Sequence, residues 1–405
     1  MSLVNCEKTA LEGESDMKVY YDEKTDPARI LVIGVGGAGC NAVNHMVKKG
    51  LTGAAIAAAN TDRQALETCL ADIKIPLGDT VTRGLGAGAD PEIGRMAAEE
   101  SQEEIKKALE GYDMVFIAAG MGGGTGTGAS PVVARIAREE GLLVVAIVTK
   151  PFRFEGQAKH DKAEAGLHEL REQTNVLLVI SNTKLAETTR ELPMPQAFAQ
   201  ADDILYHAAR SVVDIIRNPG YVNVDFADVR TVMKSGGLSL IGIGEAKGEN
   251  RAVSATKSAL SAPLLDGIES ISGADRILVN IQFPDNPDFG LRMEEMEAIL
   301  NTISQEATGQ SGSPEMIVGM VIDRELTETI RVTVIATGIK ERKGFMSGYR
   351  YTGTGARPAR TSRMDKEKDK DRLVVDGGLY SGLEFRRSSM DPDEEDDWRE
   401  FGSKA

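Results

Sequence analysis

Residues 120–130, GMGGGTGTGAS, hold six glycines and two threonines in eleven positions. Glycine loses more conformational freedom on folding than any other residue, so such a run belongs where the backbone approaches another group closely or takes a positive φ. The segment follows a short apolar run, DMVFIAAG, and precedes PVVARIAREEG, which has helical periodicity. A glycine-rich turn between a strand and a helix is typical of a phosphate-binding loop.

A second glycine loop, GVGGAG at 34–39, matches G-x-G-x-x-G between an apolar strand and a helix. In a dinucleotide enzyme an acid should end the second strand, but here Asp62 comes late and behind Asn60. Two such loops at neighbouring strand ends can surround one polyphosphate. The sequence has no G-x-x-x-x-G-K-[ST] motif, so we expect the phosphates to be held by main-chain N–H groups, by threonine hydroxyls and by the helix starts near Ala38 and Ser130. Mg²⁺ would neutralise their charge.

The pattern predicts an α/β fold with a parallel sheet covered on both faces, because continuous apolar strands alternate with helices over 28–195. The expected strands are RILVIGVGG, GAAIAAANTD, DMVFIAAG, LLVVAIVTKPF and NVLLVISN. Residues 196–218 then carry apolar side chains three or four apart, which indicates one long connecting helix that stops at Pro219. Four more strands and two helices, near 250–262 and 292–306, predict a smaller α+β domain over 219–340.

Composition excludes several classes of protein. A net charge of -15 argues against nucleic acid and anionic lipid as partners. Three cysteines without paired spacing fit a reducing compartment, and no apolar run suggests a signal peptide or a membrane span, so we expect a cytoplasmic protein. The extension 1–27 is polar. The charge-rich segment 341–405 is expected to be a disordered linker and tail, whose Trp398 and Phe401 could serve as a docking peptide.

Six motifs together resemble the FtsZ family, the tubulin-like GTPases of bacterial cell division. In chain order they are GVGGAGCNAV, AANTD, GLGAGADPEIG, GGGTGTG, PFRFEG and NVDFADVRTVM. The resemblance runs from about residue 28 to 340. It implies a tubulin-like Rossmann-type GTPase domain, GTP or GDP with Mg²⁺ as the bound cofactors, and hydrolysis coupled to polymerisation.

The resemblance also implies residue roles. By this resemblance, the first glycine loop and the 123–126 loop bind the α- and β-phosphates, and residues 86–88 bind the γ-phosphate. Glu155 binds the ribose, and Phe198, Asn182 and Asp202 contact the base. Asp202 suits guanine, because a carboxylate accepts from the paired N1–H and N2–H donors. The full set of expected nucleotide-binding residues is Gly36, Gly37, Ala38, Asn41, Asn60, Asp62, Gly86, Ala87, Gly88, Gly123, Gly124, Thr125, Gly126, Thr127, Glu155, Lys159, Asn182, Phe198 and Asp202.

The catalytic residues implied by the resemblance are Asp225 and Asp228, with Asn223, in NVDFADV. In the family these acids reach into the site of the next subunit and polarise the attacking water. From the residues alone, Asn223 and Asp225 are equally good helix caps. A contact of this head-to-tail kind generates an open filament. The implied partners are therefore further copies of the chain, plus a membrane tether or division proteins bound by the tail, at the mid-cell division site.

Three features depart from the family pattern: Lys159 stands where arginine is common, Cys40 replaces a frequent glycine, and the tail DDWREFGSKA lacks the usual apolar, basic-ended docking peptide. Three other readings stay open. They are a tubulin-like filament for DNA segregation or cell shape, a Rossmann NAD-dependent oxidoreductase, and a nucleotide-binding scaffold that does not hydrolyse.

Overall fold

The computed structural model describes residues 28–188, 193–217, 224–234, 238–261, 270–308 and 314–339. The expectations for the extension 1–27, for Asn223 and for the tail 341–405 lie outside these residues.

Ten strands form one hydrogen-bonded sheet in the order β3-β2-β1-β4-β5-β6-β7-β10-β8-β9. Pairing is parallel from β3 to β7, and β10 then runs antiparallel to both β7 and β8. The strands are β1 Ile30–Val35, β2 Ala55–Asn60, β3 Ile73–Pro76, β4 Met114–Gly120, β5 Leu143–Lys150, β6 Val176–Ser181, β7 Leu238–Ala246, β8 Arg276–Phe283, β9 Glu315–Ile322 and β10 Ile330–Ile339. A tubulin-like parallel sheet followed by a smaller mixed region confirms the predicted fold class.

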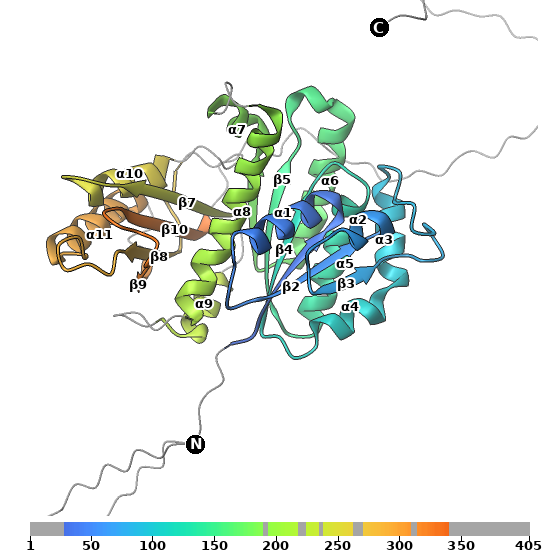
Figure 1. The fold of residues 1–405 in the computed structure, drawn as a ribbon, viewed down its shortest axis with the longest axis horizontal. Coiled ribbons are helices and arrows are strands. Elements are labelled where there is room, and N and C mark those ends of the chain that lie inside the picture. Colours follow the sequence, from blue (N-terminus) through green and yellow to red (C-terminus); the bar gives the residue numbers. More distant parts are fainter. Residues whose placement is uncertain are drawn as a thin grey trace, which may run out of the picture. The chain divides into compact units, whose positions relative to one another are not determined.

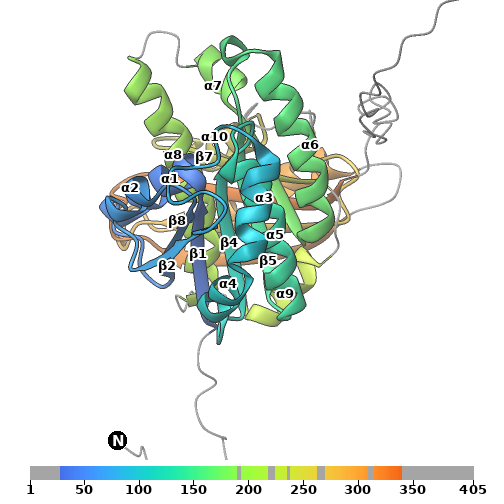
Figure 2. The ribbon, with the colours of Figure 1, turned by 90° about the vertical axis from the view of Figure 1, so that its right-hand side faces the viewer.

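Helices cover both faces of the parallel strands (Figures 1 and 2). They are α1 Gly36–Lys48, α2 Arg63–Glu67, α3 Pro91–Glu100, α4 Gln102–Leu109, α5 Thr125–Glu139, α6 Gln157–Gln173, α7 Asn182–Thr188, α8 Met194–Arg217, α9 Phe226–Met233, α10 Arg251–Ser261 and α11 Met293–Ala307, with a 3₁₀ turn η1 at Arg153–Glu155.

The strand β1 shows why both faces are apolar. Ile30 and Val32 belong to the core beneath α1 and α8, whereas Leu31, Ile33 and Val35 belong to the core beneath α3 to α6. Successive side chains of a strand point to opposite faces, so a strand that is buried on both sides needs an unbroken apolar run. This is the reason that the strands could be read from the sequence.

Two details differ from the expectation. Helix α5 begins at Thr125 rather than near Ser130, so Pro131 lies inside the helix. A helix interior usually excludes proline, which made Pro131 look like a first-turn residue. The edge strand β3 was not anticipated, because four residues with an exposed Lys74 carry too little apolar periodicity.

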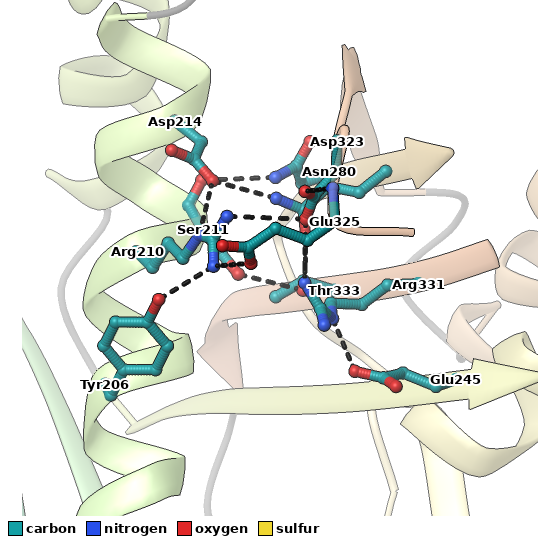
Figure 3. A network of polar contacts seen from close by, with 11 residues as sticks. Tyr206, Arg210, Ser211, Asp214, Glu245, Asn280, Asp323, Glu325, Arg331 and Thr333 are labelled. Carbon is teal, nitrogen blue, oxygen red and sulfur yellow. Dashed lines mark hydrogen bonds and ion pairs between the residues drawn. The ribbon is translucent and has the colours of Figure 1, made fainter. Parts of the chain in front are cut away.

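The long helix α8 is attached to the second half of the sheet by a partly buried polar network (Figure 3). Arg210 donates to Glu325 at 2.9 Å and to the hydroxyl of Tyr206 at 2.8 Å. Gln282 of β8 donates to Asp214 at 2.9 Å. Directional bonds of this kind hold α8 in one register against β8 to β10, beyond what apolar packing alone would specify.

None of the helices in the described segments combines the length and apolar character needed to cross a bilayer.

Candidate nucleotide-binding site

A pocket of about 370 Å³ opens at the carboxyl edge of the parallel strands. Gly120 ends β4 and Thr149 lies one residue before the end of β5, and both line it. In parallel α/β sheets this edge is where ligands bind. The pocket is lined by twelve of the expected residues, namely Gly37, Ala38, Asn41, Gly123, Gly124, Thr125, Gly126, Glu155, Lys159, Asn182, Phe198 and Asp202.

Several glycines in the two loops have no room for a side chain. A Cβ on Gly36 would lie 2.7 Å from the amide nitrogen of Gly126, and a Cβ on Gly126 would lie 2.4 Å from the carbonyl oxygen of Gly120. Glycine is required there because the two loops pack backbone against backbone.

Gly37 and Gly123 are different, since a Cβ on either would meet nothing within 4 Å. Both line the pocket, and the position that a Cβ would take on each is open space. A ligand in the pocket could therefore come close to their main chain, as main-chain phosphate binding requires.

Asn182, Phe198 and Asp202, which the sequence predicts to contact the base, all line the pocket. The amide oxygen of Asn182 is buried without a hydrogen-bond partner in the described part of the chain. Burial raises the pKa of Asp202 to about 6. By smaller amounts, His45 lowers this pKa and the negative charge of Asp203 raises it. A buried polar atom without a partner and a desolvated carboxylate both mark a surface that a polar ligand would complete.

Phe198 lines the pocket and contacts an aromatic ring outside its lining. Phe198 is 44% exposed and meets Phe152 edge to face, with ring centroids 5.2 Å apart. Phe152 in turn stacks on Phe154 at 5.0 Å. Phe198 therefore presents a free surface on which a purine could stack.

Glu155 and Lys159 are paired beside the pocket. One Glu155 oxygen accepts from the main chain of Phe152 at 2.9 Å, and the other accepts from Lys159 Nζ at 2.8 Å. Among the pocket-lining residues that the structure describes, Lys159 is the one cation. The negative charge of bound phosphates would therefore exceed the positive charge that the pocket lining supplies.

Seven expected residues lie outside the pocket lining: Gly36, Asn60, Asp62, Gly86, Ala87, Gly88 and Thr127. Asp62 caps α2 by accepting from Ala65, and Thr127 accepts from the Gly122 amide at 2.8 Å. Thr125 instead bonds through its hydroxyl to Thr61 at 2.6 Å. These side chains hold the loops in shape. In the 86–88 loop, the Cβ of Ala87 lies 2.8 Å from the position that a Cβ on Gly124 would take, so this loop packs against the 123–126 loop.

Asp225 and Asp228 lie at the opposite edge of the sheet. Asp225 caps α9, accepting from the Asp228 amide at 2.8 Å, as the capping alternative predicted. Arg230 of α9 donates to the carbonyl oxygen of Gly141, in the turn that precedes β5, whereas the pocket lies at the far end of that eight-residue strand. A strand of this length spans about 25 Å. The two exposed acids therefore cannot reach the pocket of their own chain.

Sequence reasoning missed other residues of the lining, including Thr149, Pro151, Ala201 and Leu205. For Ala201 and Leu205 a signal existed. They lie three and seven residues after Phe198, on the same face of α8, so a role for Phe198 implied contact by both.

The fold and this site define a class: a tubulin-like nucleotide-binding protein without a P-loop. Residues 29–190 match the model of the Tubulin/FtsZ family GTPase domain, and residues 237–340 match that of the FtsZ family C-terminal domain. The chain is 48% identical over 315 residues to cell division protein FtsZ 1 of Pyrococcus horikoshii, covering 78% of this chain and 82% of that protein. It is 44% identical over 361 residues to cell division protein FtsZ of Buchnera aphidicola, covering 86% and 92%.

A solved structure titled as an empty FtsZ dimer, from M. jannaschii, superposes with a TM-score of 0.71 at 44% identity, covering 77% of this chain and 89% of that one. The chain belongs to the FtsZ family. It is accordingly a GTPase that binds GTP and GDP.

Proposed function

We propose that this GTPase assembles head to tail into filaments that form the division ring, and that each nucleotide site is completed by Asp225 and Asp228 of the adjoining subunit. The observation that carries the proposal is the separation of these acids from their own pocket. They are exposed at the amino edge of the sheet, and the pocket opens at the carboxyl edge. When copies stack along the strand direction, these two surfaces meet.

Exposed apolar side chains around the pocket support a contact between copies. Leu85, next to the 86–88 loop, is 85% exposed, and Phe154, next to Glu155, is 67% exposed. A contact between copies on this side of the subunit would cover both side chains and remove their apolar surface from water. Because one face of the subunit would meet a different face of the next, the contact does not close on itself and a filament results. The similarity to a protein solved as a dimer agrees with self-association.

Within the site, Gly37 and Gly123 would hold the phosphates through main-chain N–H groups, and Asp202 and Asn182 would read the guanine edge. The adjoining subunit's acids would orient the water that attacks the γ-phosphate, which is phosphoryl transfer by positioning. In the described residues no group of three His, Cys, Asp or Glu side chains could hold a metal ion. Mg²⁺ would therefore be bound mainly by the phosphates and water, and it would supply charge neutralisation.

The proposed site predicts a concentration threshold. GTP turnover per subunit is expected to be near zero in dilute solution and to rise to a plateau above a critical concentration, because an isolated subunit lacks the acids. Phosphate release measured against protein concentration, with sedimentation in GTP and in GDP, provides the test. Turnover per subunit that is constant down to the lowest concentration would contradict the shared site, and no turnover at any concentration would favour a scaffold. Fluorescence localisation in dividing cells separates a division ring from a filament for DNA segregation.

Guanine binding by Asp202 predicts a pH dependence. The carboxylate form accepts from guanine, and the pKa of Asp202 is about 6 in the free protein. The contribution of Asp202 to GDP affinity is therefore expected to be constant above that pH and to fall by up to about tenfold per unit below it. Equilibrium titration with GDP between pH 8 and pH 5 measures this. The Asp202→Asn variant, which has no titrating group at this position, should bind more weakly and keep only the shallower pH dependence of the terminal phosphate, whose second pKa is about 6. The same shallow profile in the unchanged protein would disprove the role.

A further inference from the structure

Two basic residues of α1 converge on one acid of α8. His45 Nε2 lies 2.7 Å from Asp203 Oδ1, and Lys49 Nζ lies 3.1 Å from the same oxygen. The side chain of His45 is 20% exposed and that of Asp203 is 36% exposed. Since the contact is partly shielded from water, it is stronger than a fully exposed ion pair.

This contact joins residues that neighbour the pocket lining on both helices. His45 follows Asn41 by one helical turn, so the two share a face of α1, and Asn41 lines the pocket. Asp203 is the neighbour of Asp202 on α8. The start of α1 carries the phosphate loop and α8 carries the base-binding residues, so the contact connects the parts of the pocket that meet the two ends of a nucleotide.

Packing alone leaves this spacing loosely specified. The facing residues of the two helices are apolar, with Val43 and Met46 of α1 in the same core as Leu205 and Ala209 of α8. Contacts between such side chains are not directional, whereas hydrogen bonds weaken steeply away from their preferred distance and angle. Two hydrogen bonds from guanine to one carboxylate need that accuracy, and in the described residues no group hydrogen bonds to the Asp202 carboxylate to hold it.

We propose that Asp203, held by His45 and Lys49, is a positioning residue for guanine recognition. It sets the register of α8 on α1 so that Asp202 meets N1–H and N2–H of the base. The inference rests on the proposed reading of guanine by Asp202.

The pKa shifts of Asp202 and Asp203 allow the positioning effect to be measured separately from the ionisation of Asp202. Burial raises the pKa of Asp203, but hydrogen bonds from His45 and Lys49 outweigh burial and bring the pKa below its usual value. Its negative charge contributes to the raised pKa of Asp202. Replacing Asp203 by alanine would therefore favour the ionised Asp202 and, near pH 6, oppose the loss of positioning. At pH 8 Asp202 is ionised in either protein, so only positioning remains.

The test compares the affinities of the full-length protein for GDP and IDP at pH 8, because IDP lacks the 2-amino group. Asp203→Ala and His45→Leu are each expected to weaken GDP binding about three- to tenfold and to lower the preference for GDP over IDP. The double variant should be no worse than Asp203→Ala, because that change already removes the contacts of Asp203 with both His45 and Lys49. His45→Gln, whose amide nitrogen can replace Nε2 as donor, should restore the preference.

Glu325→Ala is the matched control. It removes a bond of 2.9 Å to Arg210, which lies on the same helix as Asp203 and does not line the pocket; Figure 3 shows this bond. This variant should lower the melting temperature while the preference for GDP over IDP stays unchanged. If Asp203→Ala and His45→Leu behave in the same way, the contact is only structural and the inference is wrong. If Asp202→Asn also keeps the preference, the assignment of guanine recognition to Asp202 fails, and the inference fails with it.

Discussion

Replacing Asp228 by asparagine is expected to lower GTP turnover by about 10²- to 10⁴-fold while GDP binding stays within about twofold of the unchanged protein. The reason is the distance between Asp228 and its own pocket, which the length of β5 separates. Asp228 cannot touch the nucleotide that its own subunit binds. A water-positioning carboxylate supplied by the neighbour contributes to the transition state and little to ground-state affinity.

The measurement needs both quantities on one preparation: phosphate release above the assembly threshold, and GDP affinity by equilibrium titration below it. Sedimentation shows whether the variant still assembles, which separates lost chemistry from lost contact. Turnover that survives in assembled Asp228→Asn, and equally in Asp225→Asn, would show that other groups orient the water.

The asparagine and alanine variants of Asp225 separate its proposed role in turnover from its role as a helix cap. Asp225 caps α9 through its side chain, and asparagine caps a helix about as well. Asp225→Asn should therefore lose turnover without loss of stability, whereas Asp225→Ala should also lose about 1 kcal/mol of unfolding free energy. Thermal or urea unfolding of the two variants checks this difference. Equal turnover in Asp225→Asn and the unchanged protein would show that Asp225 acts only as a helix cap and has no role in turnover.

Gly123→Ala is expected to fold normally and to bind GDP about 5- to 150-fold more weakly, corresponding to about 1–3 kcal/mol of overpacking against the ligand. A Cβ at this position enters only the open pocket, with nothing within 4 Å. The melting temperature of the free protein should therefore change little. Gly37→Ala has the same surroundings and should behave alike.

Gly126→Ala is the matched contrast from the same loop. Its Cβ would lie 2.4 Å from the Gly120 carbonyl oxygen, so the packing of the loop must change even when no nucleotide is bound. We expect reduced folded yield or a clearly lower melting temperature, measured by circular dichroism alongside the GDP titration. If Gly123→Ala destabilised the free protein as much as Gly126→Ala, the space beside Gly123 would not be open for a ligand. Unchanged GDP affinity in Gly123→Ala would also contradict the phosphate site.

Much of the fold was predictable because it follows from short-range patterns. Helix α8 was expected over 196–218 and is observed at Met194–Arg217, since its apolar spacing is regular over six turns. The start of α5 was misplaced because the rule against interior proline is statistical, and tertiary packing of this helix prevails over it. The domain boundaries at 195 and 218 stay predictions.

The candidate site was predictable where it depends on the main chain. Glycine-rich turns after parallel strands converge at one edge of the sheet, so their meeting follows from the order of elements. Side-chain directions are a different matter. The apolar periodicity of α8 includes Phe198, which predicts a buried side chain. Phe198 is instead exposed at the pocket. Burial depends on which residues the neighbouring elements place opposite a side chain, and the periodicity of one helix does not contain that information.

By itself, the sequence determined the strand and helix pattern, the glycine loops and the family, since each of these is written in consecutive residues. Only the tertiary structure decided that Thr127 turns inward to Gly122, that Asp203 contacts His45 across 158 positions, and that Asp225 and Asp228 lie at the edge away from the pocket. These features depend on how distant segments pack, and packing is set by the whole core rather than by any local stretch.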